Sequence, residues 1–212
     1  MKPPKPRGKP AAKLAAKPAA KPAAKPPRDA PEPRASELRI VAGEWRGRRI
    51  AVPDGAVRPT ADKVREAWMS IIQAYIVDAR VLDLCAGSGA LGLETLSRGA
   101  AHADFVENDP KVFQTLQQNI ATLKAGARAT VHRASAVPFV EAATEPWDLA
   151  LADPPYGKGI ALALAERWLR TPFATIFGVE HEATLTLPVP EGRTVDRRQY
   201  GITALTIYRT DR

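Results

Sequence analysis

Four residues in the second half of the chain could hold an amino group that is about to react. Asp153-Pro154-Pro155-Tyr156 follows the apolar run Leu149–Ala152, which predicts that they lie at the carboxyl end of a strand. The Asp153 carboxylate and the Pro154 carbonyl can accept both N–H bonds of an exocyclic base amine and free its lone pair for attack on a methyl donor. Tyr156 offers a flat face for the base. Taken alone, the segment could also be an ordinary turn stiffened by prolines.

A glycine-rich loop earlier in the chain predicts a cofactor site. The strand-like run Val81–Cys85 leads directly into Ala86-Gly87-Ser88-Gly89-Ala90-Leu91-Gly92. Its spacing, Gly-x-Gly-x-x-Gly, lets the backbone approach a ligand, and the helix that follows begins with unpaired N–H donors. Nicotinamide and flavin enzymes share this motif, so the loop alone does not choose the cofactor.

Two acidic residues favour S-adenosylmethionine over a nicotinamide cofactor. Asp83 lies just before the loop, where its carboxylate can meet the ammonium group of a cofactor that contains an amino acid. Glu107 ends the next strand, placed to accept hydrogen bonds from ribose hydroxyls. The alternative is that Asp83 only caps the turn and Glu107 faces solvent. The other cofactor contacts that we expect around them are Ala86, Gly87, Ser88, Gly89 and Asn108.

The elements that would position these residues alternate between strand and helix. Strands are expected at Arg80–Leu84, His102–Val106, Arg128–His132, Asp148–Ala152 and Ala174–Val179, and helices at Ala90–Ser97, Pro110–Leu123, Val137–Ala143 and Ile160–Leu169. This alternation predicts an α/β, Rossmann-like fold with a mostly parallel sheet covered on both faces. Three further strand-like runs, Thr184–Leu187, Thr194–Arg198 and Ile202–Tyr208, predict a terminal antiparallel hairpin.

The segment 38–57 is expected to be a β-hairpin in front of a catalytic core at 58–212. Its strand-like runs, Arg39–Gly43 and Arg48–Val52, flank Glu44–Gly47. A helix follows Arg58, and its apolar face is expected in the core: Val64, Trp68, Ile71, Ile72 and Tyr75. Arginines cluster before the near-neutral domain and favour RNA contact over a solvated surface: Arg39, Arg46, Arg48, Arg49, Arg58 and Arg65.

The charge of the chain is concentrated in its first 37 residues. The 212 residues carry a net charge of +8, and residues 1–37 hold ten Lys and Arg against three Asp and Glu. Prolines interrupt the Lys-Pro-Ala-Ala pattern, so we expect a disordered basic tail. Such a tail serves either as a solubilising linker or as an electrostatic tether to RNA phosphates. The sequence leaves both roles open, and neither sets specificity.

Several classes of protein are disfavoured by the sequence. A single cysteine, Cys85, excludes an internal disulfide and a zinc site built from several cysteines. Apolar runs of membrane-spanning length and a secretory signal are absent, so a cytoplasmic protein is expected. Glu180-His181-Glu182 follows a strand, but three consecutive side chains of an extended chain cannot all face one ion. We therefore expect no metal and place this segment at the rim of the crevice.

The motifs of this sequence resemble those of a known family. Asp83–Gly89 and Asp153–Tyr156 are similar to the motifs of methyltransferases that act on amino groups of bases. Three segments resemble the bacterial family that methylates N2 of guanine G966 in small-subunit ribosomal RNA: 39–49, 58–66 and 82–99. The resemblance covers residues 38–212. It implies a class I methyltransferase with a seven-stranded sheet, acting as a monomer on 16S RNA in a folded or partly assembled small subunit.

One segment departs from the family pattern. After the third strand of the sheet an acidic residue is expected near the adenine amine of the cofactor, but the chain has Arg133-Ala134-Ser135-Ala136. Ser135 and Ala136 are therefore the expected adenine contacts. Two other functions stay open: a DNA adenine-N6 methyltransferase, which uses a similar tetrapeptide, and an RNA-binding module without catalytic activity.

Overall fold

The computed structural model describes Met1 and residues 37–53, 59–189, 191 and 195–210, with the backbone alone for 59–63. The compact unit Ala35–Arg212 holds every helix and strand that it describes. In chain order these are β1 (Glu37–Arg39), β2 (Arg49–Ala51), α1 (Pro59–Ile72), β3 (Arg80–Leu84), α2 (Ala90–Ser97), β4 (His102–Glu107), α3 (Pro110–Leu123), β5 (Ala129–Arg133), α4 (Ala136–Glu141), β6 (Trp147–Ala152), α5 (Ile160–Arg170), β7 (Ala174–Glu182), β8 (Asp196–Tyr200) and β9 (Thr203–Arg209). Short 3₁₀ turns lie at Gln73–Tyr75 and Gly126–Arg128.

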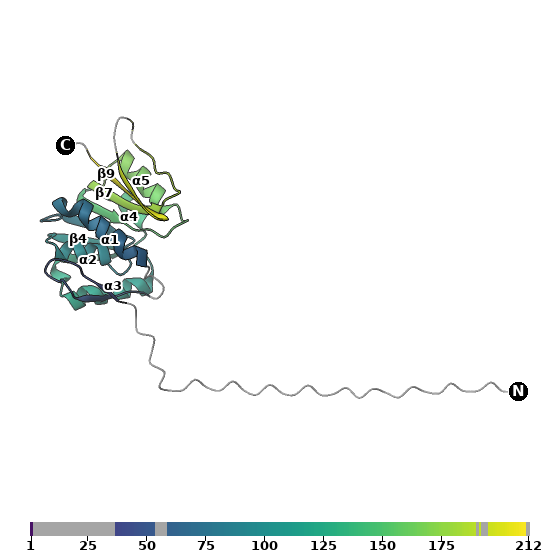
Figure 1. Ribbon diagram of the computed structural model, residues 1–212, viewed down its shortest axis with the longest axis horizontal. Coiled ribbons are helices and arrows are strands. Elements are labelled where there is room, and N and C mark those ends of the chain that lie inside the picture. Colours follow the sequence, from purple (N-terminus) through teal and green to yellow (C-terminus); the bar gives the residue numbers. More distant parts are fainter. Residues whose placement is uncertain (2–36, 54–58, 190, 192–194, 211–212) are drawn as a thin grey trace. The chain divides into compact units, whose positions relative to one another are not determined.

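Seven strands form one sheet in the order β5-β4-β3-β6-β7-β9-β8 (Figure 1). Strands β3 to β7 are parallel, whereas β9 is antiparallel to both β7 and β8. The chain runs outward from β3 to β5 and then returns to β6 on the other side of β3. This reversal places a crevice beyond the carboxyl ends of β3 and β6, where ligands bind in open sheets of this kind. The expected fold, with its terminal hairpin, is confirmed.

Two apolar layers cover the two faces of the sheet. Successive residues of β3 alternate between them: Val81 packs in the layer beneath α1, α2 and α3, and Leu82 packs in the layer beneath α4 and α5. Both side chains are fully buried. A parallel strand that is buried on both faces consists almost wholly of apolar residues, so a carboxylate inside it is a marked exception. Within the described residues, no helix is long and apolar enough to cross a bilayer.

The β1–β2 hairpin is fixed to helix α2 through backbone groups. The buried carboxylate of Glu94 accepts from the amides of Val41 and Ala42 at 2.8 and 3.0 Å. At Gly43 the backbone has a φ of +82°, and a Cβ there would lie 1.7 Å from the carbonyl oxygen of Ser97. Only glycine allows this approach. The hairpin is therefore a docked part of the folded unit.

Some predicted boundaries are wrong for identifiable reasons. The first hairpin strand, Glu37–Arg39, shares only Arg39 with the predicted Arg39–Gly43, because Val41 and Ala42 donate to Glu94 of α2 instead of to a partner strand. The second strand, Arg49–Ala51, is one residue shorter at each end than the predicted Arg48–Val52. Thr184–Leu187 is not a strand: it begins in a turn closed by the bond from the Leu185 amide to Glu182, and Pro188 after it has no N–H for a ladder.

The predicted apolar face of the first helix is confirmed only up to its end. Val64, Trp68 and Ile72 are buried and Ile71 is partly buried, but Tyr75 is 38% exposed. Helix α1 ends at Ile72, and the following 3₁₀ turn changes the angular spacing of the side chains. Tyr75 therefore turns away from the core.

The β8 strand begins at Asp196. Its predicted first residue, Thr194, lies outside the described residues.

Close packing at Gly178 gives a test of how α1 packs on the sheet. A Cβ at this position of β7 would lie 2.2 Å from Trp68 and 2.8 Å from Ile207. We expect Gly178→Ala to lower the free energy of unfolding by about 1–3 kcal/mol, the usual cost of overpacking a core. Urea denaturation measures it. Gly126→Ala is the control, because no atom lies within 4 Å of its added methyl group. Equal midpoints for the two variants would contradict this packing.

Candidate functional site

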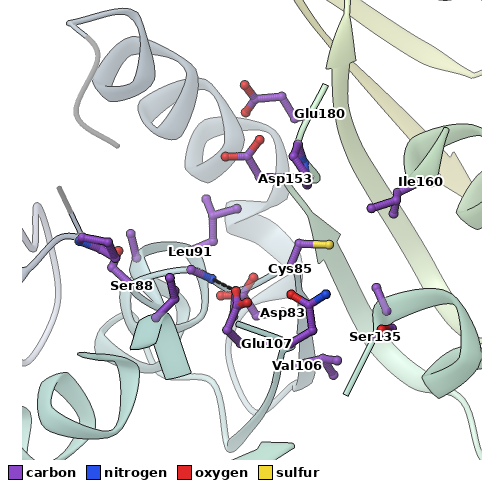
Figure 2. Close-up of a pocket in the computed structure, with 18 of the residues that line it drawn as sticks. Asp83, Cys85, Ser88, Leu91, Val106, Glu107, Ser135, Asp153, Ile160 and Glu180 are labelled. Carbon is purple, nitrogen blue, oxygen red and sulfur yellow. Dashed lines mark hydrogen bonds between the residues drawn. The ribbon is translucent and has the colours of Figure 1, made fainter. Parts of the chain in front are cut away.

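A pocket of about 800 Å³ opens at the carboxyl ends of β3, β4 and β6 (Figure 2). The structure brings most of the predicted site residues to its wall: Asp83, Ala86, Gly87, Ser88, Glu107, Asn108, Ser135, Ala136, Asp153 and Pro155. Gly89, Pro154 and Tyr156 are not among the residues that line it. The lining also includes Cys85, Leu91 and Ile160, which the sequence did not predict as contacts, and Glu180, which was predicted at the rim of the crevice.

Asp83 ends the central strand as a buried carboxylate at the floor of the pocket. Its side chain is 1% exposed, and Oδ2 accepts from the Gly92 amide at 2.9 Å. Burial raises the pKa of this carboxyl to about 8; the hydrogen bond from Gly92 opposes the rise, and the nearby charges of Asp153 and Glu107 add to it. Asp83 thus caps the loop and also lines the pocket, so the capping bond does not keep it from facing a ligand.

The glycines of the loop have separate structural tasks. Gly87 and Gly89 both have positive φ, +57° and +81°. A Cβ at Gly89 would lie 2.5 Å from Leu116 of α3, so this glycine permits helix packing behind the pocket. Gly87 faces the pocket instead, and its amide donates to Glu107 at 2.9 Å. The pocket is lined by Ala86, Gly87 and Ser88 and, after Gly89, by Ala90 and Leu91.

Glu107 is held in place by two backbone amides. Its Oε2 accepts from Gly87 and its Oε1 accepts from Asp109, at 2.9 and 2.8 Å. The side chain is 8% exposed and lines the pocket beside Val106 (Figure 2). A carboxylate oxygen has two lone pairs, so each oxygen keeps one acceptor site for a pair of hydroxyls. The alternative that Glu107 faces solvent is wrong.

Asn119 is a structural residue of the site that the sequence did not reveal. Its side-chain amide donates to the carbonyl of Ser88 in the loop at 2.8 Å. The same side chain exchanges two hydrogen bonds with the backbone of Ala51 in β2, at 2.8 and 2.9 Å. One buried amide thereby joins the N-terminal hairpin to the glycine loop. A polar residue on the inner face of an otherwise amphipathic helix was the available signal.

The tetrapeptide places its groups at different depths. Asp153 and Pro155 are exposed at the pocket wall, and Pro154 is buried. The hydroxyl of Tyr156 lies 2.7 Å from Thr203 Oγ1 and donates to Glu180 Oε1 at 3.2 Å. Burial raises the pKa of Tyr156 to about 12, so the phenol stays neutral. Tyr156 is thus fixed by two neighbouring strands, β7 and β9.

The wall opposite the loop is formed by the start of α4. Ser135 is the N-cap of this helix, but its side chain makes no capping hydrogen bond. Ala136 follows at the first helical position and is 7% exposed. Both residues line the pocket. Their contact with an adenine ring stays a prediction. The pocket wall here carries Ser135 and Ala136, where the family pattern has an acidic residue.

The pocket is strongly acidic. Among the described residues that line it, four are acidic and one is basic: Asp83, Glu107, Asp153 and Glu180 against Arg65. Such a wall favours a ligand with positive charge and disfavours the diphosphate of a dinucleotide.

In the described part of the chain, no group of three or more His, Cys, Asp or Glu side chains is placed to hold a metal ion.

Part of the predicted arginine cluster surrounds a second, smaller cleft of about 310 Å³. Arg39, Arg49 and Arg65 line it, and Arg65 also lines the main pocket, so the two hollows adjoin. Arg46 is exposed in the hairpin turn and Arg48 donates to the carbonyl of Thr122, both away from this cleft. Arg58 lies outside the described residues.

The chain has relatives that are named methyltransferases. Ribosomal RNA small subunit methyltransferase D from Haemophilus influenzae is 36% identical over 182 residues, which cover 81% of this chain and 93% of that protein. The protein of the same name from Escherichia coli (strain K12) is 46% identical over 127 residues, 59% of this chain. That match spans 64% of the length of the E. coli protein.

The fold is also found in a solved structure, and the sequence matches a family model. The structure named "Putative methyltransferase yhhF" from Escherichia coli superposes with a TM-score of 0.73 and 39% identity, covering 82% of this chain and 97% of that one. Residues 38–209 match the model described as Conserved hypothetical protein 95. The chain therefore belongs to the Conserved hypothetical protein 95 family, as a class I methyltransferase-fold relative of ribosomal RNA small subunit methyltransferase D.

Proposed function

We propose that this protein transfers a methyl group from S-adenosylmethionine to the N2 amine of a guanine in 16S ribosomal RNA, at G966. The observation that carries the proposal is the acidic pocket at the ends of β3, β4 and β6, with the Asp153 segment at its wall. Membership of the family supports ribosomal RNA as the substrate. The resemblance of residues 39–49, 58–66 and 82–99 supports the choice of guanine N2.

The charges of the pocket fit the proposed cofactor. S-adenosylmethionine carries an ammonium and a sulfonium group against one carboxylate, so it is cationic overall. Asp83 would accept from the ammonium group, and the remaining lone pairs of Glu107 would accept from the two ribose hydroxyls. Ser135 and Ala136 would contact the adenine ring. When bound, the cofactor supplies an electrophilic methyl group.

Asp153 and its neighbours would prepare the nucleophile. The Asp153 carboxylate and the Pro154 carbonyl accept the two N–H bonds of the amine, and Tyr156 stacks on the base. With both N–H bonds held, the nitrogen lone pair would be free to accept the methyl group that the bound cofactor would supply. Asp153 would accept the proton that the nitrogen loses. Positioning of this kind can supply about 7–11 kcal/mol of the barrier.

The arginine cleft would hold the RNA backbone beside the pocket. Arg39 and Arg49 face each other across the hairpin, and Glu37 pairs with Arg49 at 3.0 Å. Three arginines against Glu37 and Glu66 leave the lining of the cleft with a net positive charge, which is consistent with a phosphate ligand. Because Arg65 lines both hollows, a phosphate in the cleft would lie next to a base in the pocket. The tail 1–37 would add only sequence-independent attraction.

The direct experiment is transfer of labelled methyl groups onto unmethylated small subunits, followed by mass spectrometry of the nucleosides. N2-methylguanosine at G966 is the expected product. N6-methyladenosine in DNA would favour the adenine-N6 alternative. RNA binding without cofactor binding or methyl transfer would favour the module without catalytic activity.

Cofactor binding should release a proton from Asp83. At pH 7 a carboxyl with a pKa of about 8 is mostly protonated, and it must ionise to meet an ammonium group. We therefore expect release of close to one proton per cofactor at pH 7, and affinity that rises with pH up to about 8. Calorimetry in two buffers of different ionisation enthalpy measures the release. Asp83→Asn should abolish it, whereas Asp148→Asn at the opposite end of β6 should not. Unchanged release in Asp83→Asn would exclude this assignment.

Asp153→Ala should separate binding from catalysis. Since Asp153 is assigned to the amine, cofactor affinity should change little, while turnover should fall by at least about 100-fold, as on loss of one preorganised polar contact. Equilibrium binding and single-turnover methyl transfer measure the two quantities. The assigned role is wrong if the variant binds cofactor poorly but reaches normal turnover at saturation.

The arginine cleft should account for part of the salt dependence of RNA binding. Replacing Arg39 and Arg49 together by alanine should reduce the slope of log K against log salt by up to roughly 1.4–1.8, because each neutralised phosphate contributes about 0.7–0.9. Filter binding at several salt concentrations measures the slope. Arg170→Ala is the control, since this exposed arginine ends α5 on the other face of the sheet. Equal slopes for wild type and the double variant would remove the cleft from the interface.

A further inference from the structure

Glu180 is an acidic residue of the pocket for which cofactor binding and methyl transfer need no role. It belongs to β7 and lines the pocket together with Asp153. In the sheet, Ala152 of β6 is paired with Val179 of β7, so the next residues, Asp153 and Glu180, follow at matching positions. Neighbouring strands lie about 4.8 Å apart. Figure 2 shows both carboxylates turned into the same part of the pocket.

Glu180 is also tied to the aromatic residue that would stack on the base. The Tyr156 hydroxyl donates to Glu180 Oε1 at 3.2 Å and lies 2.7 Å from Thr203. This contact places the Glu180 carboxylate beyond the hydroxyl end of the ring, not over its face. A base that stacks on the ring would therefore present one of its edges to Glu180.

The two purine bases differ on the edge in question. Guanine places the N1–H donor next to its N2 amine, so three N–H bonds lie in a row. Adenine places an unprotonated N1 acceptor next to its N6 amine. A carboxylate has only acceptors. It therefore binds the N1–H of guanine and faces a lone pair on adenine, where it leaves a buried polar group unmatched.

We propose that Glu180 selects guanine by accepting a hydrogen bond from its N1–H, while Asp153 accepts from the N2 amine that is methylated. This inference rests on the proposed function and names the residue that chooses the base. Two acceptors on adjacent strands match two neighbouring donors on one edge of guanine. The Tyr156 hydroxyl uses one acceptor site of Glu180 Oε1, out of the four or so that a carboxylate has.

The test uses a base that keeps the reacting amine but lacks the N1–H. Small subunits are assembled with RNA that carries either guanine or 2-aminopurine at the methylated position, and kcat/KM is measured on both. Wild type should favour guanine by at least about 1,000-fold, because sites built to bind a substrate N–H reject analogues without it by large factors. In Glu180→Gln the amide can donate to the bare N1, so this ratio should fall by at least about 100-fold.

Two matched variants separate base selection from a structural role. Glu182→Gln removes the same charge two residues further along β7, outside the pocket lining, and should keep the wild-type ratio. Tyr156→Phe keeps the ring but removes the hydroxyl that contacts Glu180, and should lower activity on both substrates by similar factors.

The outcomes distinguish this inference from the proposed function. Equal losses on both substrates in Glu180→Gln would show that Glu180 acts only through Tyr156, and the inference would be overturned. Equal wild-type rates on guanine and 2-aminopurine would overturn it without any variant. If wild type transfers no methyl group to guanine at all, the proposed function itself fails.

Discussion

The site depends on one constraint, the burial of a carboxylate at the end of the central strand. Asp83 is stabilised there by the Gly92 amide, which reaches it only because α2 begins very close to the sheet. A Cβ at Gly92 would lie 2.4 Å from Phe105 and 3.0 Å from Asp83 Oδ2, so a larger residue would push the helix away. The third glycine of the loop therefore positions the acid, whereas the first, Gly87, positions Glu107. The carboxyl groups of Asp83 and Glu107 thus both accept hydrogen bonds from amides of the same glycine motif.

The N-terminal hairpin extends this arrangement to the surface. Asn119 bonds both to Ala51 in the hairpin and to Ser88 in the glycine loop. Glu94, on the helix that begins at this loop, fixes the turn of the hairpin. Displacement of the hairpin would therefore cost buried hydrogen bonds at both places. The surface proposed to contact RNA is thus joined by buried hydrogen bonds to the pocket in which the base would react.

The sequence predicted the parts of this structure that depend on local pattern. The bounds of β3, α2 and α3 were predicted to the residue, because glycine, proline and capping residues mark their ends. The pocket residues around Asp83 and Glu107 followed from the rule that ligands lie at the carboxyl ends of strands. What could not be predicted depends on contacts between distant segments. Glu180 and Tyr156 meet only because β7 and β6 are neighbours, and Arg48 leaves the arginine cluster only because α3 offers it the Thr122 carbonyl.

The separation of charge between the two hollows gives a reason why a base, and not a phosphate, would enter the pocket. The main pocket is lined by four acidic residues and Arg65, while three arginines line the adjoining cleft together with Glu37 and Glu66. Phosphates would therefore be attracted more to the cleft than to the pocket, which would keep the RNA backbone outside. An uncharged base edge with several N–H donors would instead favour the pocket over the cleft, because carboxylates accept its hydrogen bonds. The same acidic groups that would hold a cationic cofactor thus also orient the RNA with its base inward.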